Sequence, residues 1–386
     1  MTKSIRTILM PLLIINYAFG LRIVNLSRHL KLFTVLYMML IWSIYYFFAT
    51  SPLISSFFEY FPIQDNICYW LESFTTLLSI VFGVYHEKKF QNCLRKFDIV
   101  DNTLLRLGTI TNYDKLCKRT VRFILGWFLA VILSTYSVSL FIKNEHNRDV
   151  ATSMFFMLIR DYSFHLNFIG DLTIASILEY IRLKFDQINE HLHNMTRNNK
   201  IKQAWENSVV YPHEHRFSKT LSSKYTLWII IHLHLELRKI SREIDSIFGM
   251  QMTFKMACYF GWIANDLHEV LYAILVNNYV KYNIMSATLH FIWFSLNVFK
   301  FLLINYMCEI VSTKAQTTVD LLNKLLYSTC DIEVHQIISQ FSLWAINTPL
   351  RFCGIGLFQF GFKFLHRFVT SLATVSIIIL QAQANK

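Results

Sequence analysis

Charged side chains interrupt several apolar stretches of this sequence, and their chemistry needs an explanation before anything else. The stretch 152–180 contains Arg160, Asp161 and Asp171, and the stretch 252–276 contains Lys255 and Asp266. A charge inside a lipid bilayer is costly, so such residues usually face the protein interior or a water-filled cavity. These positions could bind a polar ligand, form internal ion pairs or take part in proton transfer.

Eight residues are the candidates for a ligand site, because their depth in the apolar stretches places them in one half of a helix bundle. Aromatic walls with a few directed polar groups are typical of a small-molecule pocket. The alternative is a set of internal ion pairs, with Arg160 bound to Asp266 or Glu72 and no ligand. The candidates are Glu72, Tyr136, Arg160, Asp161, His165, Trp262, Asp266 and Trp293.

Four further charged residues lie deeper or closer to the inner surface. Asp171 and Lys300 lie deeper than the candidate site, and we expect them to be structural. Lys255 and Arg367 lie near the inner membrane surface, where a long side chain can extend its charge into water.

Motifs that would indicate an enzyme or a metal protein are not found. The sequence has no GxSxG, no HExxH and no phosphate-binding loop, so it predicts neither catalysis nor a cofactor. The pairs His191/His193 and His232/His234 are poor metal sites, because residues two apart on a helix point to different faces. No CxxC occurs among the seven cysteines, which predicts free thiols.

The composition indicates an integral membrane protein. Of 386 residues, 54% are hydrophobic and 16% are charged, whereas soluble domains carry about 25% charged residues. The net charge of +12 could suggest a nucleic-acid partner, but the basic residues lie in short segments between apolar stretches. That placement favours contact with anionic lipid and predicts no nucleic acid.

Seven stretches are long and apolar enough to be membrane-spanning helices. None contains a proline, so uninterrupted helices are expected. The earlier stretch 8–21 could be a signal peptide, but Pro11 and the lack of a cleavage site favour a short helix at the membrane surface. The seven predicted spans are 32–50, 67–85, 121–142, 152–180, 252–276, 286–308 and 364–382.

Lysine and arginine set the predicted orientation. The segment before the first span and the next two alternate loops carry five, eight and eleven of them, while the opposite loops carry none, two and one. Basic loops stay in the cytoplasm, so we predict a cytoplasmic N-terminus and, after seven spans, an extracellular C-terminus. This orientation is opposite to that of a G-protein-coupled receptor.

The predicted inner loops are long and have helical apolar stripes. Phe185, Ile188 and Leu192 recur at helical spacing, and so do Ile240 and Ile244. Spans four to six should therefore continue as amphipathic helices that pack within one chain or join subunits. The predicted organisation is an N-terminal segment 1–31, spans 32–180, an anchor 181–251, spans 252–308, a second anchor segment 309–361 and a last span with its tail, 362–386.

The end of the chain carries a family resemblance. The run from Thr374 to Gln381 resembles the signature of the insect gustatory receptor family in its seventh span, Thr-Tyr, five hydrophobic residues and Gln-Phe, although Ser376 occupies one of the five hydrophobic positions. In that signature Thr is followed by Tyr and Gln by Phe, whereas this chain has Val375 and Ala382. The segment "QFSLWAINTPLRFCGIGLFQF" and the opening "MPLLIINYAFGLR" also resemble the family.

The resemblance implies an all-α, seven-span, ligand-gated and non-selective cation channel in the plasma membrane of a sensory neuron dendrite. It implies a small-molecule tastant, permeating cations, a lipid bilayer and a homotetramer or heterotetramer of related subunits. The last span would line a central pore, and Ala382 would offer little bulk for a gate where the family has Phe. The implied pore and gate residues are Thr374, Ile378, Ile379, Gln381 and Ala382.

Two other classes remain as alternatives, a G-protein-coupled receptor and a membrane transporter. The predicted orientation argues against the first. The second would be expected to show internal repeats and broken helices, and the sequence shows neither.

Overall fold

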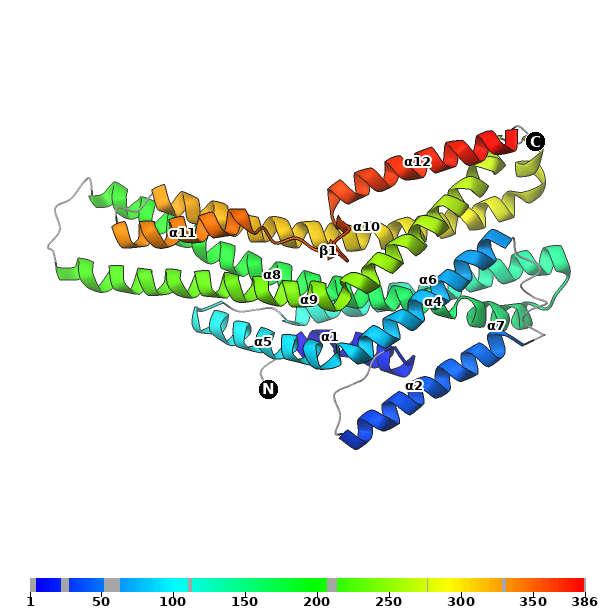
Figure 1. Cartoon of the computed structure of the whole chain (residues 1–386), viewed down its shortest axis with the longest axis horizontal. Helices are drawn as coiled ribbons and strands as arrows, with labels where there is room; N and C mark the ends of the chain where they lie inside the picture. The colour runs from blue at the N-terminus through cyan, green and yellow to red at the C-terminus, as the bar shows by residue number, and fades with distance from the viewer. Residues whose placement is uncertain are drawn as a thin grey trace.

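The computed structural model describes residues 5–21, 28–51, 63–109, 113–206, 214–275, 277–327 and 331–384. These residues are almost all helical and form an elongated bundle (Figure 1). The helices are α1 (Ile5–Ala18), α2 (Arg28–Ala49), α4 (Ile63–Tyr85), α5 (Glu87–Arg106), α6 (Tyr113–His146), α7 (Val150–Arg160), α8 (Tyr162–Glu206), α9 (Glu214–Leu275), α10 (Asn277–Tyr327), α11 (Ile332–Asn347) and α12 (Phe362–Ala384).

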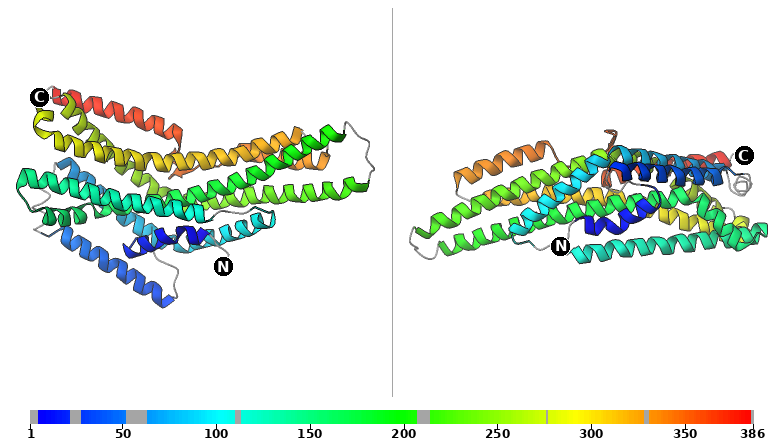
Figure 2. Two further views of the ribbon diagram at one scale, coloured as in Figure 1. Left: turned by 180° about the vertical axis from the view of Figure 1, so that it is seen from behind. Right: turned by 90° about the horizontal axis from the view of Figure 1, so that it is seen from below.

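Three very long helices run through the molecule. The helices α8, α9 and α10 contain 45, 62 and 51 residues, so each continues well past its predicted span. Proline is absent from all three, which leaves their backbone hydrogen bonds unbroken. At one end they pack with α11, and at the other they diverge among α4, α6, α7 and α12 (Figures 1 and 2).

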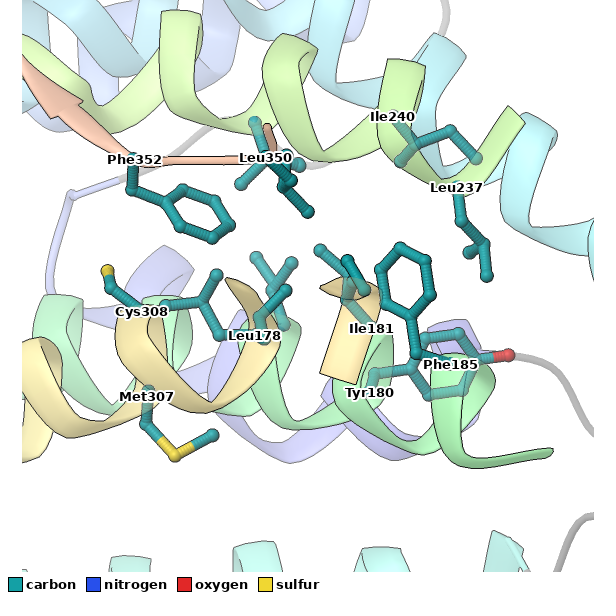
Figure 3. Packing of buried hydrophobic residues seen from close by; sticks show 14 of the residues in the cluster. Leu178, Tyr180, Ile181, Phe185, Leu237, Ile240, Met307, Cys308, Leu350 and Phe352 are labelled. Atoms are coloured by element: carbon teal, nitrogen blue, oxygen red, sulfur yellow. The ribbon is translucent and has the colours of Figure 1, made fainter. Parts of the chain in front are cut away.

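The continuous core lies in the extended part of these helices. The predicted apolar stripes are confirmed: Phe185, Ile188 and Leu192 of α8 and Ile240 and Ile244 of α9 are all buried in one cluster. Figure 3 shows Phe185 close to Leu237, and Phe352 close to Cys308, so residues far apart in sequence share this core. Each fully buried Leu, Ile or Phe contributes roughly 1.5–3 kcal/mol, which makes this cluster the main packing contribution.

The helix α1 packs into the same core. Ile5, Ile8 and Leu9 are buried against it, and Leu12 belongs to a neighbouring cluster with Trp42. The stretch 8–21 therefore contains a helix, as predicted, and one apolar face of that helix contacts protein.

Four helices are apolar and long enough to cross a membrane among the described residues: Leu32–Ala49, Asp65–Tyr85, Tyr113–Asn144 and Met285–Tyr327. They contain the predicted spans one, two, three and six. The other three predicted spans are also helical, in α7 and α8, in α9 and in α12, but do not meet the same apolar criterion. Outward faces of α2 and α6 expose many large apolar side chains, as expected for contact with lipid.

The expectation of uninterrupted helices is wrong for the fourth span. The helix α7 ends at Arg160, Asp161 has backbone angles of −89° and 9°, and α8 begins at Tyr162. The Asp161 amide closes α7 on the Met157 carbonyl at 2.8 Å, while the Asp161 carbonyl accepts from the His165 amide at 3.0 Å. This turn contains neither proline nor glycine, so composition could not reveal it.

A short hairpin connects α11 with α12. The helix α11 ends at Asn347, just before Thr348 and Pro349, because the residue before proline disfavours helix. The strands β1 (Cys353–Gly354) and β2 (Phe358–Gln359) then pair antiparallel. The Asp245 carboxylate accepts from the Cys353 amide at 3.0 Å, which attaches the hairpin to α9.

Candidate functional site

Glu72 of α4 lies at the centre of the buried polar residues. It is 2% exposed, and its carboxylate accepts from the Trp262 indole of α9 at 2.8 Å. Its other oxygen lies 3.8 Å from the Lys300 ammonium of α10. Three helices are therefore joined through one carboxylate.

Asp266 forms a second buried centre, one turn beyond Trp262 on α9. Its carboxylate lies 3.4 Å from the His290 imidazole and 3.4 Å from the Asn297 amide, both on α10. Asp266 is 1% exposed, so these two groups replace much of the solvation that burial removes.

The turn between α7 and α8 supplies Arg160, Asp161 and His165. Arg160 is buried and forms an ion pair with Asp161 at 3.9 Å, while Glu72 has Lys300 as its ion partner. These pairs differ from the Arg160–Asp266 or Arg160–Glu72 pair that the sequence suggested.

A pocket of about 280 Å³ opens between α6, α8 and α10. The Lys300 ammonium lies 3.3 Å from the centre of the Phe164 ring, which forms one wall. The buried Nε2 of His165 and the Lys300 ammonium have no hydrogen-bond partner in the structure. The pocket is lined by Trp127, Ala130, Val131, Ser134, Phe164, His165, Phe168, Leu296 and Lys300.

The structure brings together most, but not all, of the predicted ligand residues. His165 lines the pocket. Glu72 is the ion partner of Lys300, and it accepts a hydrogen bond from Trp262. Trp293 packs edge-on against the Phe164 wall, with ring centres 4.7 Å apart. Tyr136 lies apart from these residues, on a face of α6 where its side chain is 47% exposed.

The sequence did not identify Trp127 as a pocket residue, and it predicted a purely structural role for Lys300. A lysine within the apolar stretch 286–308 was the available signal, because an ammonium group at that depth needs a polar partner or a cavity. Trp127 had no such signal, since an aromatic residue in a span most often faces lipid or core.

The expectation that Lys255 extends to the membrane surface is wrong. Its side chain is buried, and its ammonium donates to the Asp171 carboxylate and to the Asn167 carbonyl, each at 2.7 Å. The Tyr259 hydroxyl also donates to Asp171. The opposing carboxylate on α8, which the sequence did not place beside Lys255, makes the buried charge tolerable.

The helix α12 has one packed face and one open face. Phe368, Leu372 and Ser376 are buried, whereas Thr374, Ile378 and Gln381 are exposed. The exposed residues are spaced four and three apart, so they share one face of the helix. The side chains of Ile379 and Ala382, two of the predicted gate residues, lie outside the described residues.

The buried histidines do not form a metal site in the described part of the chain. His232 is exposed and His234 is buried, as expected for residues two apart on a helix. No group of three His, Cys, Asp or Glu side chains that could hold a metal ion occurs among the described residues.

Long apolar helices, buried charges and an aromatic pocket define an all-helical membrane protein. The fold is similar to that of the insect olfactory receptor OR5 from Machilis hrabei in complex with eugenol, with a TM-score of 0.64 and 10% identity over 98% of this chain and 97% of that one. A second structure of OR5 gives a TM-score of 0.63 at 10% identity, with 98% and 100% coverage.

The sequence comparisons give the family. The family model described as 7tm Chemosensory receptor matches residues 9–385, and the chain therefore belongs to this family. The chain is also 21% identical to a putative gustatory receptor 28b of Drosophila melanogaster, over 77% of this chain and 65% of that relative's length. The resemblance to insect chemoreceptors is thus confirmed, and the family is not an enzyme family.

Proposed function

We propose that this chain is a subunit of a gustatory receptor that works as a ligand-gated, non-selective cation channel in the plasma membrane. The observation that carries the proposal is the pocket between α6, α8 and α10, where the Lys300 ammonium and the His165 Nε2 lie beside aromatic walls without a hydrogen-bond partner among the described residues. A small tastant that supplies the missing hydrogen bonds would be held by its apolar body and oriented by these two groups.

Two routes connect this pocket to α12. Along α10, Asn305 accepts from the Gly361 amide at 3.1 Å and Glu309 accepts from the Phe362 amide at 3.2 Å, at the start of α12. Phe301 of α10 stacks on Phe368 of α12, with ring centres 3.9 Å apart. A ligand that shifts Lys300 would therefore move the helix that holds the base of α12.

The open face of α12 supports a role in the pore. Thr374, Ile378 and Gln381 have no cover within one chain, and four copies around an axis would turn them toward a shared centre. In this arrangement Ile378 forms an apolar constriction that dewets when closed, and Gln381 forms a polar ring beside it. The packed ends of α8 to α11 would form the anchor between subunits.

The first experiment records membrane current from cells that express this chain, alone and with related subunits, against a panel of tastants. Eugenol, the ligand in one OR5 structure, serves as an aromatic probe. The proposal expects agonist-evoked cation current that persists when G-protein signalling is blocked. Current abolished by that block would support a G-protein-coupled receptor instead.

A second experiment tests α12 directly. Ile378→Cys should make the current sensitive to an extracellular, membrane-impermeant thiol reagent, whereas Leu372→Cys, on the packed face, should stay insensitive. A C-terminal epitope tag should also stain on intact cells. Equal sensitivity of both variants, or staining only after permeabilisation, contradicts the proposed pore and orientation.

A further inference from the structure

A second pocket lies between α1, α4, α8 and α9, and it shares no lining residue with the pocket beside Lys300. The empty space between its lining atoms is about 500 Å³, part of which is open solvent. In the predicted orientation it lies near the inner membrane surface, because Gly83 lies two residues before the end of span two and Gln251 directly precedes span five. The lining residues are Asn16, Leu21, Ser79, Phe82, Gly83, Leu166, Asn167, Gly170, Thr173, Ile247, Phe248, Gln251 and Lys255.

The polar lining holds hydrogen-bonding capacity that the protein does not use. Asn167 is 3% exposed, and its amide nitrogen donates to the Glu72 carbonyl at 3.2 Å, while its Oδ1 has no hydrogen-bond partner among the residues that the structure describes. The Lys255 ammonium has three N–H groups, and two of them go to Asp171 and to the Asn167 carbonyl. An unpaired buried acceptor is costly unless something else occupies the site.

Glycine keeps the pocket open at this point. A Cβ atom on Gly170 would lie 2.8 Å from the Lys255 Nζ and 3.6 Å from the Gln251 amide nitrogen. A side chain at position 170 would therefore occupy space directly beside the Lys255 ammonium.

The charge balance indicates what the pocket can accept. Asp171 already neutralises Lys255 at 2.7 Å, so the polar floor carries no net charge. A hydroxyl group carries both a donor and an acceptor, which are the two functions that Asn167 Oδ1 and the third N–H of Lys255 leave unused. The remaining wall is mixed: Leu21, Phe82 and Phe248 give it apolar surface, and neutral polar residues such as Ser79 and Gln251 complete it.

We propose that this pocket binds a neutral, hydroxyl-bearing amphiphile from the inner leaflet, with its hydroxyl group between Asn167 and Lys255 and its apolar body against Phe82 and Phe248. The site is separate from the proposed tastant pocket and does not depend on channel activity. A soluble polyol offers the same hydroxyl chemistry, so the test includes both sources.

The test measures binding by the thermal midpoint of the purified chain in lipid nanodiscs. The probes are dioctanoylglycerol, myo-inositol and dioctanoyl phosphatidic acid. We expect dioctanoylglycerol to raise the midpoint in a saturable manner and the anionic phosphatidic acid to bind more weakly. Saturable binding of inositol alone would support the same site with a soluble ligand.

Two variants connect the binding to this pocket. Gly170→Ala should abolish the saturable shift, and Gly126→Ala is its matched control, because a Cβ atom at Gly126 of α6 meets nothing within 4 Å. Asn167→Leu, which removes the acceptor together with the amide that donates to the Glu72 carbonyl, should weaken binding about tenfold and serves if Gly170→Ala does not fold. The proposal is wrong if the wild type and Asn167→Leu show equal shifts. It is also wrong if neither neutral probe gives a saturable shift, or if phosphatidic acid binds more tightly than dioctanoylglycerol.

Discussion

Lys184 and Lys300 are both fully buried, and the difference between their surroundings separates a structural charge from one available to a ligand. Lys184 of α8 lies 2.7 Å from the Asp101 carboxylate and donates to Gln187 at 3.2 Å. Lys300 of α10 lies 3.8 Å from Glu72 and has no hydrogen-bond partner. The first charge is compensated by the protein, whereas the second faces a pocket with unused donors.

The aromatic neighbours of the two lysines differ as well. The rings of Tyr180 and Tyr113 face Lys184 at 4.9 and 5.7 Å, and both hydroxyls donate to Asp101. Burial lowers the pKa of Lys184, and the neighbouring Asp101 carboxylate opposes that shift. Lys300 has an aromatic ring on one side and the pocket on the other. The arrangement around Lys184 is suited to stability and the one around Lys300 to recognition.

The largest expected effect is on stability, from Lys184→Met. It leaves the Asp101 carboxylate buried without its cation, which costs roughly 3–5 kcal/mol. The thermal midpoint in detergent and the yield of monodisperse protein should both fall strongly. Lys314→Met is the control, because the Lys314–Asp186 pair is partly exposed and is worth at most about 1 kcal/mol.

A double variant tests whether the loss comes from the unpaired charge. Lys184→Met together with Asp101→Leu removes both charges and should recover part of the stability. If the Lys184→Met and Lys314→Met variants are equally stable, the structural role of Lys184 is wrong.

The next effect should be on ligand sensitivity, from Glu72→Gln with Lys300→Met. The pair is removed together, so no buried charge is left alone, and Gln can still accept from Trp262. We expect the half-maximal agonist concentration to rise about tenfold or more while surface expression stays close to wild type. Loss of expression with unchanged agonist sensitivity would make Lys300 structural as well and would remove the contrast.

His234 adds a pH-dependent effect to the region of Lys184. Its ring lies between Phe185 and Phe341, and burial lowers its pKa to about 3. The unfolded chain binds this proton near pH 6.5 and the folded chain does not, so stability is complete above pH 6.5 and is lost as pH falls from 6.5 to 3.

The expected loss at pH 5 is about 2 kcal/mol relative to pH 8. Thermal midpoints measured across this range should show it, and His234→Phe should flatten the curve. The exposed His232 is the control, because His232→Gln should leave the pH dependence unchanged. A His234→Phe curve as steep as that of the wild type would show that other groups cause the pH dependence.

The smallest expected effect concerns a carboxylate that is neither fully buried nor paired with a cation. Glu309 accepts from the Phe362 amide at the positive end of α12. Glu309→Gln keeps an acceptor but removes the charge, which should cost about 0.5 kcal/mol. Hydrogen exchange of the first-turn amides of α12 should become about twofold faster, while Glu190→Gln, at an exposed position on α8, should leave it unchanged.

Much of the helical architecture could be predicted from sequence, whereas the partners of the buried charges could not. The apolar spacing of Phe185, Ile188 and Leu192 predicts their burial, because a repeat of three and four places them on one helix face. The spacing of Arg160 and Asp161 does not reveal the turn between α7 and α8. A turn without proline or glycine is determined by packing against the neighbouring helices rather than by its own residues.

The candidate site shows the same division. Glu72, Trp262 and Asp266 could be selected as site candidates from the sequence, because a polar group in an apolar helix is costly and usually faces a partner or a cavity. Their contacts with Lys300, His290 and Asn297 depend on how α4, α9 and α10 pack. Those of Glu72 join residues about 190 to 230 positions apart, and those of Asp266 join two neighbouring helices 24 and 31 positions apart. Tyr136 had the right chemistry but lies on the exposed face of α6.

The sequence by itself determined that this protein is helical, rich in membrane-length apolar stretches, and similar at its end to insect chemoreceptors. The first two properties follow from composition and local periodicity, which need no long-range contact, and the third is a motif resemblance carried by the run from Thr374 to Gln381. The tertiary structure decided that Lys255 is paired with Asp171, that Lys300 faces a pocket, and that one face of α12 is left open. The physical reason is that the cost of a buried charge depends on the atoms within a few ångströms of it, and those atoms come from other helices.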